Sequence, residues 1–146
     1  MATPDPPQPK ISLLCVEDDP ESRDLMSRMI SMKFPDIELH LAKNGMIGLD
    51  LFKEIMPQIV MTDIRMPVMD GVTMAGEIKA LYPETRIIIV AADCNADYLL
   101  SDEEIDYCVV KPIDYKILFA VIEKCIADIT ADLPLCSTAE TLFDSQ

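Results

Sequence analysis

Residues 86–91 read Arg-Ile-Ile-Ile-Val-Ala, and this stretch decides the fold class. All of it except the first residue is apolar, and four of its residues are β-branched. A continuous apolar run of this length is typical of a strand that is covered on both faces, as the strands of parallel sheets are. The stretch therefore predicts a central strand of an α/β domain.

Strand-like and helix-like segments alternate on both sides of this run. Short apolar or alternating runs predict four further strands, at residues 11–16, 37–42, 59–61 and 107–110. Apolar residues at helical spacing predict a helix after each strand, at residues 20–33, 46–55, 72–81, 95–104 and 114–129. Five such repeats, joined by right-handed crossovers, predict a parallel sheet with helices on both faces.

The length of 146 residues fits one domain and is too short for two ordinary ones. Half of the residues are hydrophobic, which is enough for a packed core. Four of the first nine residues are proline, so we expect residues 1–9 to form a flexible arm. The chain therefore divides into this arm, a domain at residues 10–129, and a C-terminal tail or linker at residues 130–146.

Charge and cysteine content exclude several classes of function. The chain has 12 Lys and Arg residues against 26 Asp and Glu residues, a net charge of −14, which disfavours nucleic acids and anionic membrane surfaces as partners. Neither a signal peptide nor an apolar run near the roughly 20 residues of a membrane span is evident, so a cytoplasmic location is expected. Five cysteines without a Cys-x-x-Cys pair indicate reduced thiols, not a disulfide framework or a zinc site.

Charged residues stand where three of the predicted strands end. The first strand ends at Glu17-Asp18-Asp19, the third at Asp63 and the fifth at Lys111-Pro112. Open parallel sheets bind ligands at the carboxyl ends of their strands. Two carboxylates about 4 Å apart repel by roughly 4 kcal/mol at an effective dielectric constant of 20, so a lysine or a hard cation such as Mg²⁺ must offset them. Each group by itself could be an ordinary cap or turn; together they predict a metal-and-phosphate site.

Five short motifs follow one another in a recognisable order. The most specific is Asp63-x-x-Met-Pro-x-Met-Asp-Gly71. The others are Leu14-Cys-Val-Glu-Asp-Asp-Pro20, Ala42-Lys-Asn-Gly45, Pro57-Gln-Ile-Val-Met-Thr-Asp63 and Val109-Val-Lys-Pro112. Over residues 10–129 the chain thereby resembles a response-regulator receiver domain of two-component signalling, the CheY-like family. The resemblance implies a flavodoxin-like fold, a doubly wound five-stranded parallel sheet of order 2-1-3-4-5.

The resemblance also implies a role for each charged residue. Asp63 would accept a phosphoryl group from a histidine kinase or a phosphotransfer protein. Mg²⁺ would be held by Asp18 directly, by Glu17 through water, by Asp63, and by the backbone carbonyl of Arg65. Lys111, joined to the following proline by a cis peptide bond, would pair with Asp63 and then with the phosphoryl oxygens. Such a chain is a phosphoacceptor that assists its own phosphotransfer and dephosphorylation, not an enzyme with a separate substrate.

Two positions depart from the family pattern. The fourth strand of a receiver usually ends in Thr or Ser, whose hydroxyl bonds a phosphoryl oxygen, but here Ala91 and Ala92 stand at the phosphate-contact positions. The position three before the lysine is usually Tyr or Phe, but here it is Cys108, with Tyr107 on the opposite face of the strand. Because Ala91 and Cys108 occupy the switch positions, we expect phosphorylation with a weak or differently routed conformational response.

One alternative function stays open at this point. Ala91 and Cys108 favour a pseudo-receiver, a module that binds a partner independently of phosphorylation. The charged residues at the strand ends favour a phosphoacceptor: Glu17, Asp18, Asp63 and Lys111. Enzymes on related folds are excluded, because the chain lacks the Ser-, Thr- or Gly-rich phosphate loop of a flavodoxin and the Asp-x-Asp of a haloacid dehalogenase-type phosphatase. A downstream output domain or target protein is expected on the surface formed by residues 95–104 and the last strand and helix.

Overall fold

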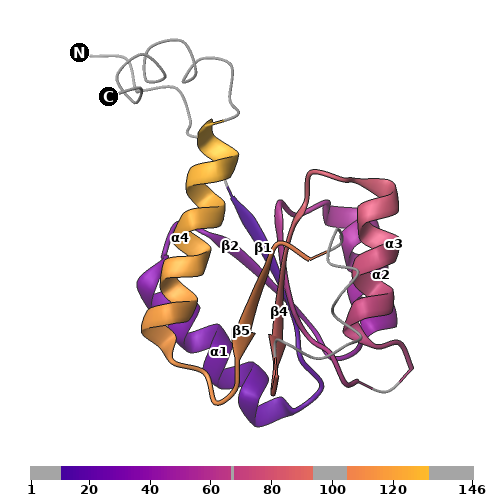
Figure 1. The fold of residues 1–146 in the computed structure, drawn as a ribbon, viewed down its shortest axis with the longest axis horizontal. Coiled ribbons are helices and arrows are strands. Elements are labelled where there is room, and N and C mark those ends of the chain that lie inside the picture. Colours follow the sequence, from indigo (N-terminus) through magenta and orange to yellow (C-terminus); the bar gives the residue numbers. More distant parts are fainter. Residues whose placement is uncertain (1–10, 67, 94–104, 132–146) are drawn as a thin grey trace, which may run out of the picture.

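The computed structural model describes residues 11–66, 68–93 and 105–131, which form one five-stranded parallel sheet flanked by helices (Figure 1). The strands are β1 (Ser12–Val16), β2 (Glu38–Ala42), β3 (Ile59–Asp63), β4 (Arg86–Ala91) and β5 (Tyr107–Val110). The helices are α1 (Pro20–Lys33), α2 (Gly45–Ile55), α3 (Gly71–Leu81) and α4 (Tyr115–Ala131). The order β2-β1-β3-β4-β5 confirms the predicted topology. The arm at residues 1–9, the expected helix at 95–104 and residues 132–146 of the tail lie outside the described residues.

Each face of the sheet packs against two helices, α1 and α4 on one side and α2 and α3 on the other (Figure 1). The central strand β4 shows why its sequence does not alternate. Ile88 and Val90 pack against the face of α1 and α4, whereas Ile87 and Ile89 pack against the face of α2 and α3. Since successive side chains of a strand point to opposite faces, both faces of β4 must be apolar.

Capping residues at the N-termini of three helices shape the loops at the carboxyl edge of the sheet. Asp19 caps α1, because its side chain accepts a 2.8 Å hydrogen bond from the amide of Ser22. Asn44 and Asp70 cap α2 and α3 in the same way. These caps satisfy amide groups that have no partner within a helix, and they fix the direction in which the chain leaves each strand.

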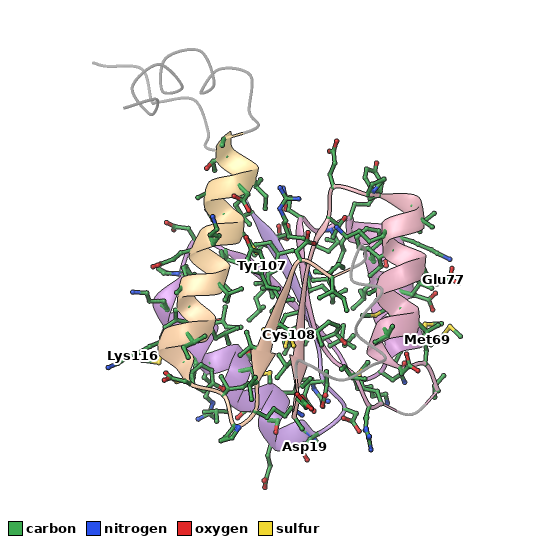
Figure 2. All side chains as sticks on the ribbon, viewed as in Figure 1. Asp19, Met69, Glu77, Tyr107, Cys108 and Lys116 are labelled. Carbon is green, nitrogen blue, oxygen red and sulfur yellow. The ribbon has the colours of Figure 1, made fainter. Side chains whose placement is uncertain are left out.

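Strand β5 directs its first two side chains to opposite faces of the sheet, as alternation predicts (Figure 2). Tyr107 packs on the face of α4, where its hydroxyl donates a 3.1 Å hydrogen bond to Oδ2 of Asp128. Cys108 packs on the opposite face, against the cluster that α2 and α3 cover. The aromatic ring of Tyr107 is therefore not a substitute for an aromatic side chain at position 108.

The cysteines correct one expectation. Cys15 and Cys125 are free and buried in the core. Cys108 is disulfide-bonded, so the expectation of reduced thiols is wrong at this position. An odd number of cysteines rules out the pairing of all five, but it does not rule out one pair.

Candidate functional site

Four charged side chains from three elements meet at the carboxyl edge of the sheet. The ammonium Nζ of Lys111, which follows β5, lies 2.7 Å from Oδ2 of Asp63 at the end of β3. Glu17 and Asp18 follow β1, and one carboxylate oxygen of each lies within 4.8 Å of the other and of a carboxylate oxygen of Asp63. The structure thus brings together the residues that the strand ends predict, and the Lys111-Pro112 peptide is cis.

Asp63 is held in one orientation by donors on both of its carboxylate oxygens. The amide of Ile64 donates a 2.7 Å hydrogen bond to Oδ1, and Lys111 donates to Oδ2. The side chain of Asp63 is 11% exposed and lines a cavity. A carboxylate that is oriented and still open to solvent on one side can react with an incoming group.

Glu17 carries a polar atom that has no hydrogen-bond partner among the described residues. The residue is 3% exposed, and its Oε2 accepts a 3.0 Å hydrogen bond from the amide of Asp19. Its Oε1 is buried and has no hydrogen-bond partner in the described part of the chain. Burial raises the pKa of this carboxyl group, and the negative charge of Asp63 raises it further. Three carboxylates, one of which has a buried oxygen with no hydrogen-bond donor among the described residues, are ligands that fit a hard cation such as Mg²⁺.

Lys111 is the counter-charge of this cluster. Burial alone would lower the pKa of its ammonium group, but the hydrogen bond to Asp63 and the charges of Asp63 and Glu17 raise the pKa above its usual value. The side chain is therefore protonated at neutral pH. Its position lets it bind Asp63 and a phosphoryl oxygen in turn.

The loop between β3 and α3 explains the Asp-Gly pair of the most specific motif. The amide of Gly71 donates a 2.8 Å hydrogen bond to the carbonyl of Ile64. A Cβ atom at Gly71 would overlap the carbonyl oxygen of Asp63, so the loop closes against the end of β3 only with glycine here. Val68 in the same loop has a φ of 77°, which is unfavourable for a β-branched residue, and it is 74% exposed.

Asp63 opens into a cavity of about 490 Å³. Its other lining residues are Ile64, Arg65, Ala91, Ala92, Asp93 and Lys111. Ala91 and Ala92 therefore line the space that a phosphoryl group on Asp63 would enter, and neither offers a hydroxyl donor. Cys108 lies apart from this space, among the apolar side chains on the face of α2 and α3.

Sequence reasoning missed one residue that contacts the site. Arg23, on α1, donates a 2.8 Å hydrogen bond from Nη1 to the carbonyl oxygen of Glu17. No motif marks this contact. The only signal in the sequence is the placement of a basic residue in the second turn of a helix that begins beside an acidic loop.

Among the residues that the structure describes, no helix combines the length and the apolar character that crossing a bilayer requires.

Comparisons with known proteins converge on one family. The family model for the response regulator receiver domain matches residues 13–123. The regulatory protein AtoC of Escherichia coli strain K12 is 31% identical over 117 residues, and the transcriptional regulatory protein ZraR of Salmonella typhimurium strain LT2 is 31% identical over 137 residues. These matches cover 78% and 90% of the chain but only 25% and 30% of the two relatives.

Solved structures with the same fold include a response regulator. The response regulator TrrA of Thermotoga maritima, in a complex with Mg²⁺ and BeF, superposes with a TM-score of 0.72 at 29% identity, over 79% of this chain and 98% of that one. The N-terminal domain of an uncharacterized protein from Wolinella succinogenes superposes with a TM-score of 0.76 at 30% identity, over 84% of this chain and 99% of that one.

Proposed function

The chain belongs to the response regulator receiver domain family, and from this premise we propose that it accepts a phosphoryl group on Asp63 in a Mg²⁺-dependent reaction. Receiver domains of two-component systems are phosphoacceptors that interact with histidine kinases or phosphotransfer proteins. The observation that carries the proposal is the 2.7 Å contact of Lys111 with Asp63, beside the carboxylates of Glu17 and Asp18. One buried oxygen of Glu17 has no donor among the described residues.

Phosphoryl transfer requires mainly that the reacting groups are aligned and that their negative charge is neutralised. A carboxylate oxygen of Asp63 attacks the phosphorus atom. The bond from phosphorus to the histidine nitrogen of the donor breaks, and that nitrogen keeps the electron pair and takes a proton from solvent. Glu17, Asp18, Asp63 and the carbonyl of Arg65 would hold Mg²⁺, which when bound offsets negative charge on the phosphoryl oxygens.

Lys111 supplies the protein's own share of this neutralisation. Before transfer its ammonium group neutralises the Asp63 carboxylate at 2.7 Å. After transfer the charge of Asp63 is spread over the phosphoryl oxygens, and the same ammonium group can donate to one of them. Hydrolysis by a water molecule that attacks the phosphorus would restore the Asp63 carboxylate and release inorganic phosphate.

The proposal includes an altered switch. Ala91 at the end of β4 is 3% exposed and carries no hydroxyl, so a phosphoryl oxygen loses a hydrogen bond that contributes about 1.5–3 kcal/mol when the acceptor is charged. Cys108 packs where the family pattern has an aromatic ring. With both changed, phosphorylation would alter the surface of β5 and α4 only weakly, and partners would bind there by other means.

The same two residues favour the second candidate, a cytoplasmic module that binds its partner irrespective of phosphorylation. In either case the functional unit would span residues 10–129, with residues 1–9 as an arm and residues 130–146 as a tail or a linker to an output domain. The chain covers only about a quarter to a third of its relatives AtoC and ZraR, so the activity of a whole protein is part of this proposal.

One experiment separates the two candidates. The chain is incubated with Mg²⁺ and acetyl phosphate, and its intact mass and amide chemical shifts are measured. We expect the mass of one phosphoryl group on the wild type and none on Asp63→Asn or without Mg²⁺, with shift changes concentrated around the cavity and small along β5 and α4. A wild type that gains no mass would refute the phosphoacceptor and favour the fixed module. Large shift changes along β5 and α4 would refute the altered switch.

A further inference from the structure

Arg23 reaches from α1 back to the loop that carries the acidic pair. Helix side chains lean toward the N-terminus, and the half-buried Arg23 follows this rule, so its Nη1 meets the carbonyl oxygen of Glu17 at 2.8 Å. A guanidinium group is always charged and only donates hydrogen bonds. The contact is therefore charge-assisted.

The peptide group between Glu17 and Asp18 is fixed by this contact. The amide of Glu17 donates a 3.0 Å hydrogen bond to the carbonyl of Ala42 at the end of β2, which sets the entry to the loop. The carbonyl of Glu17 belongs to the next peptide plane, and Arg23 is its hydrogen-bond donor. This peptide plane also contains the amide nitrogen of Asp18, so a rotation of the plane would move the carboxylates of both Glu17 and Asp18.

The loop needs such a restraint, because its two carboxylates lie within 4.8 Å of each other and of Asp63. Mutual repulsion favours any rotation that separates them. The amide of Glu17 ties the start of the loop to β2, whereas the hydrogen bonds from the amide of Asp19 to Glu17 and from the amide of Ser22 to Asp19 join the loop to itself and to the start of α1.

We infer that Arg23 is a positioning residue of the cation site, and that its hydrogen bond to the Glu17 carbonyl holds Glu17 and Asp18 in the arrangement that binds Mg²⁺. The inference rests on the proposed function, since it assigns Arg23 to the same site. Two effects of Arg23 on a cation have opposite signs. Its positive charge repels Mg²⁺, whereas its hydrogen bond organises the ligands. Whether the Kd for Mg²⁺ falls or rises when the Arg23 side chain is replaced therefore shows which effect is larger.

The test measures Mg²⁺ affinity directly, from amide chemical shifts of the full chain titrated with MgCl₂. We expect Arg23→Met to raise the Kd about tenfold, at the lower end of the range for residues that orient metal ligands. Arg23→Lys keeps the charge and one donor, and should recover part of the affinity. The matched control is Arg28→Met on the same helix, where the side chain is 73% exposed and pairs with Asp24; its Kd should stay within about twofold of the wild type.

A second readout separates positioning from a general structural role. The rate of phosphorylation by acetyl phosphate should fall for Arg23→Met at low Mg²⁺ and return to the wild-type rate at saturating Mg²⁺. Equal or tighter Mg²⁺ binding by Arg23→Met would overturn the inference, as would an equal loss in Arg28→Met. A wild type that binds no Mg²⁺ would instead refute the proposed function itself, so the two failures are distinguishable.

Discussion

Replacement of Lys111 by methionine tests the electrostatics of the site without a phosphodonor. The Lys111→Met substitution keeps most of the length of the side chain and removes its charge. Asp63 then loses the ammonium group at 2.7 Å and stays beside Glu17 and Asp18, whose carboxylate oxygens lie within 4.8 Å. We expect the free energy of unfolding to fall, and Mg²⁺ to reverse most of the loss.

The distances set the magnitude. At an effective dielectric constant of 20, unit charges 2.7 Å apart attract by roughly 6 kcal/mol, and two charges 4.8 Å apart repel by roughly 3.5 kcal/mol. Solvent screening reduces these values, because the Lys111 side chain is 39% exposed while that of Asp63 is 11% exposed. An exposed pair contributes about 0–1 kcal/mol and the loss of one partner of a buried pair costs about 3–5 kcal/mol. For this pair we expect a loss of about 2 kcal/mol.

The assay is urea unfolding followed by circular dichroism, in EDTA and in excess MgCl₂. The control is Lys116→Met, which removes the same charge from an exposed position on α4 (Figure 2) and should change stability by less than about 0.5 kcal/mol. In MgCl₂ the gap between Lys111→Met and the wild type should narrow, since a cation then neutralises the carboxylates. If Lys111→Met in EDTA were as stable as the wild type, the ammonium group would not be the counter-charge of the cluster and the reasoning would be refuted.

Two further substitutions test the fold around the site. Gly71→Ala should destabilise the domain by about 1–3 kcal/mol, because the added methyl group would overlap a backbone carbonyl oxygen of β3. Urea unfolding measures this loss. The control is Ala80→Gly at an exposed position of α3, which changes helix propensity alone. Tyr107→Phe should cost about 1 kcal/mol near pH 8, since the hydrogen bond to Asp128 is lost. Burial and Asp128 raise the pKa of Tyr107 above 10.0, so the folded state favours the neutral phenol. The stability that the neutral phenol contributes is complete below pH 10 and is lost as the pH rises through the raised pKa. The difference in unfolding free energy between wild type and Tyr107→Phe should therefore shrink above pH 10. A constant difference would contradict a stabilising hydrogen bond from Tyr107 to Asp128.

Much of the fold follows from local patterns. The unbroken apolar run of β4 predicted a strand with two covered faces, and apolar residues at helical spacing predicted α1, α2 and α3. These predictions were possible because backbone hydrogen bonding and burial impose a period on neighbouring residues. The helix expected at residues 95–104 stays a prediction, since it lies outside the described residues.

The candidate site was predictable in part for a different reason. A parallel sheet collects the carboxyl ends of its strands at one edge, so the topology alone brings Asp63 and Lys111 toward each other. The contact of Arg23 with the Glu17 carbonyl follows no such rule, because it depends on how α1 is oriented against the end of β1. Nor does any local pattern indicate that one oxygen of Glu17 is buried with no donor in the part of the chain that the structure describes.

The sequence by itself determined the order of strands and helices, the residues at each strand end and the absence of a hydroxyl at Ala91, because these depend on residue identity and on neighbours in the chain. Only the tertiary structure decided that three carboxylates gather within 4.8 Å, that Lys111 faces Asp63 at 2.7 Å, and that Arg23 donates a hydrogen bond to the Glu17 carbonyl. The physical reason is that charge interactions depend on distances between segments far apart in sequence, and the packing of helices on the sheet sets those distances.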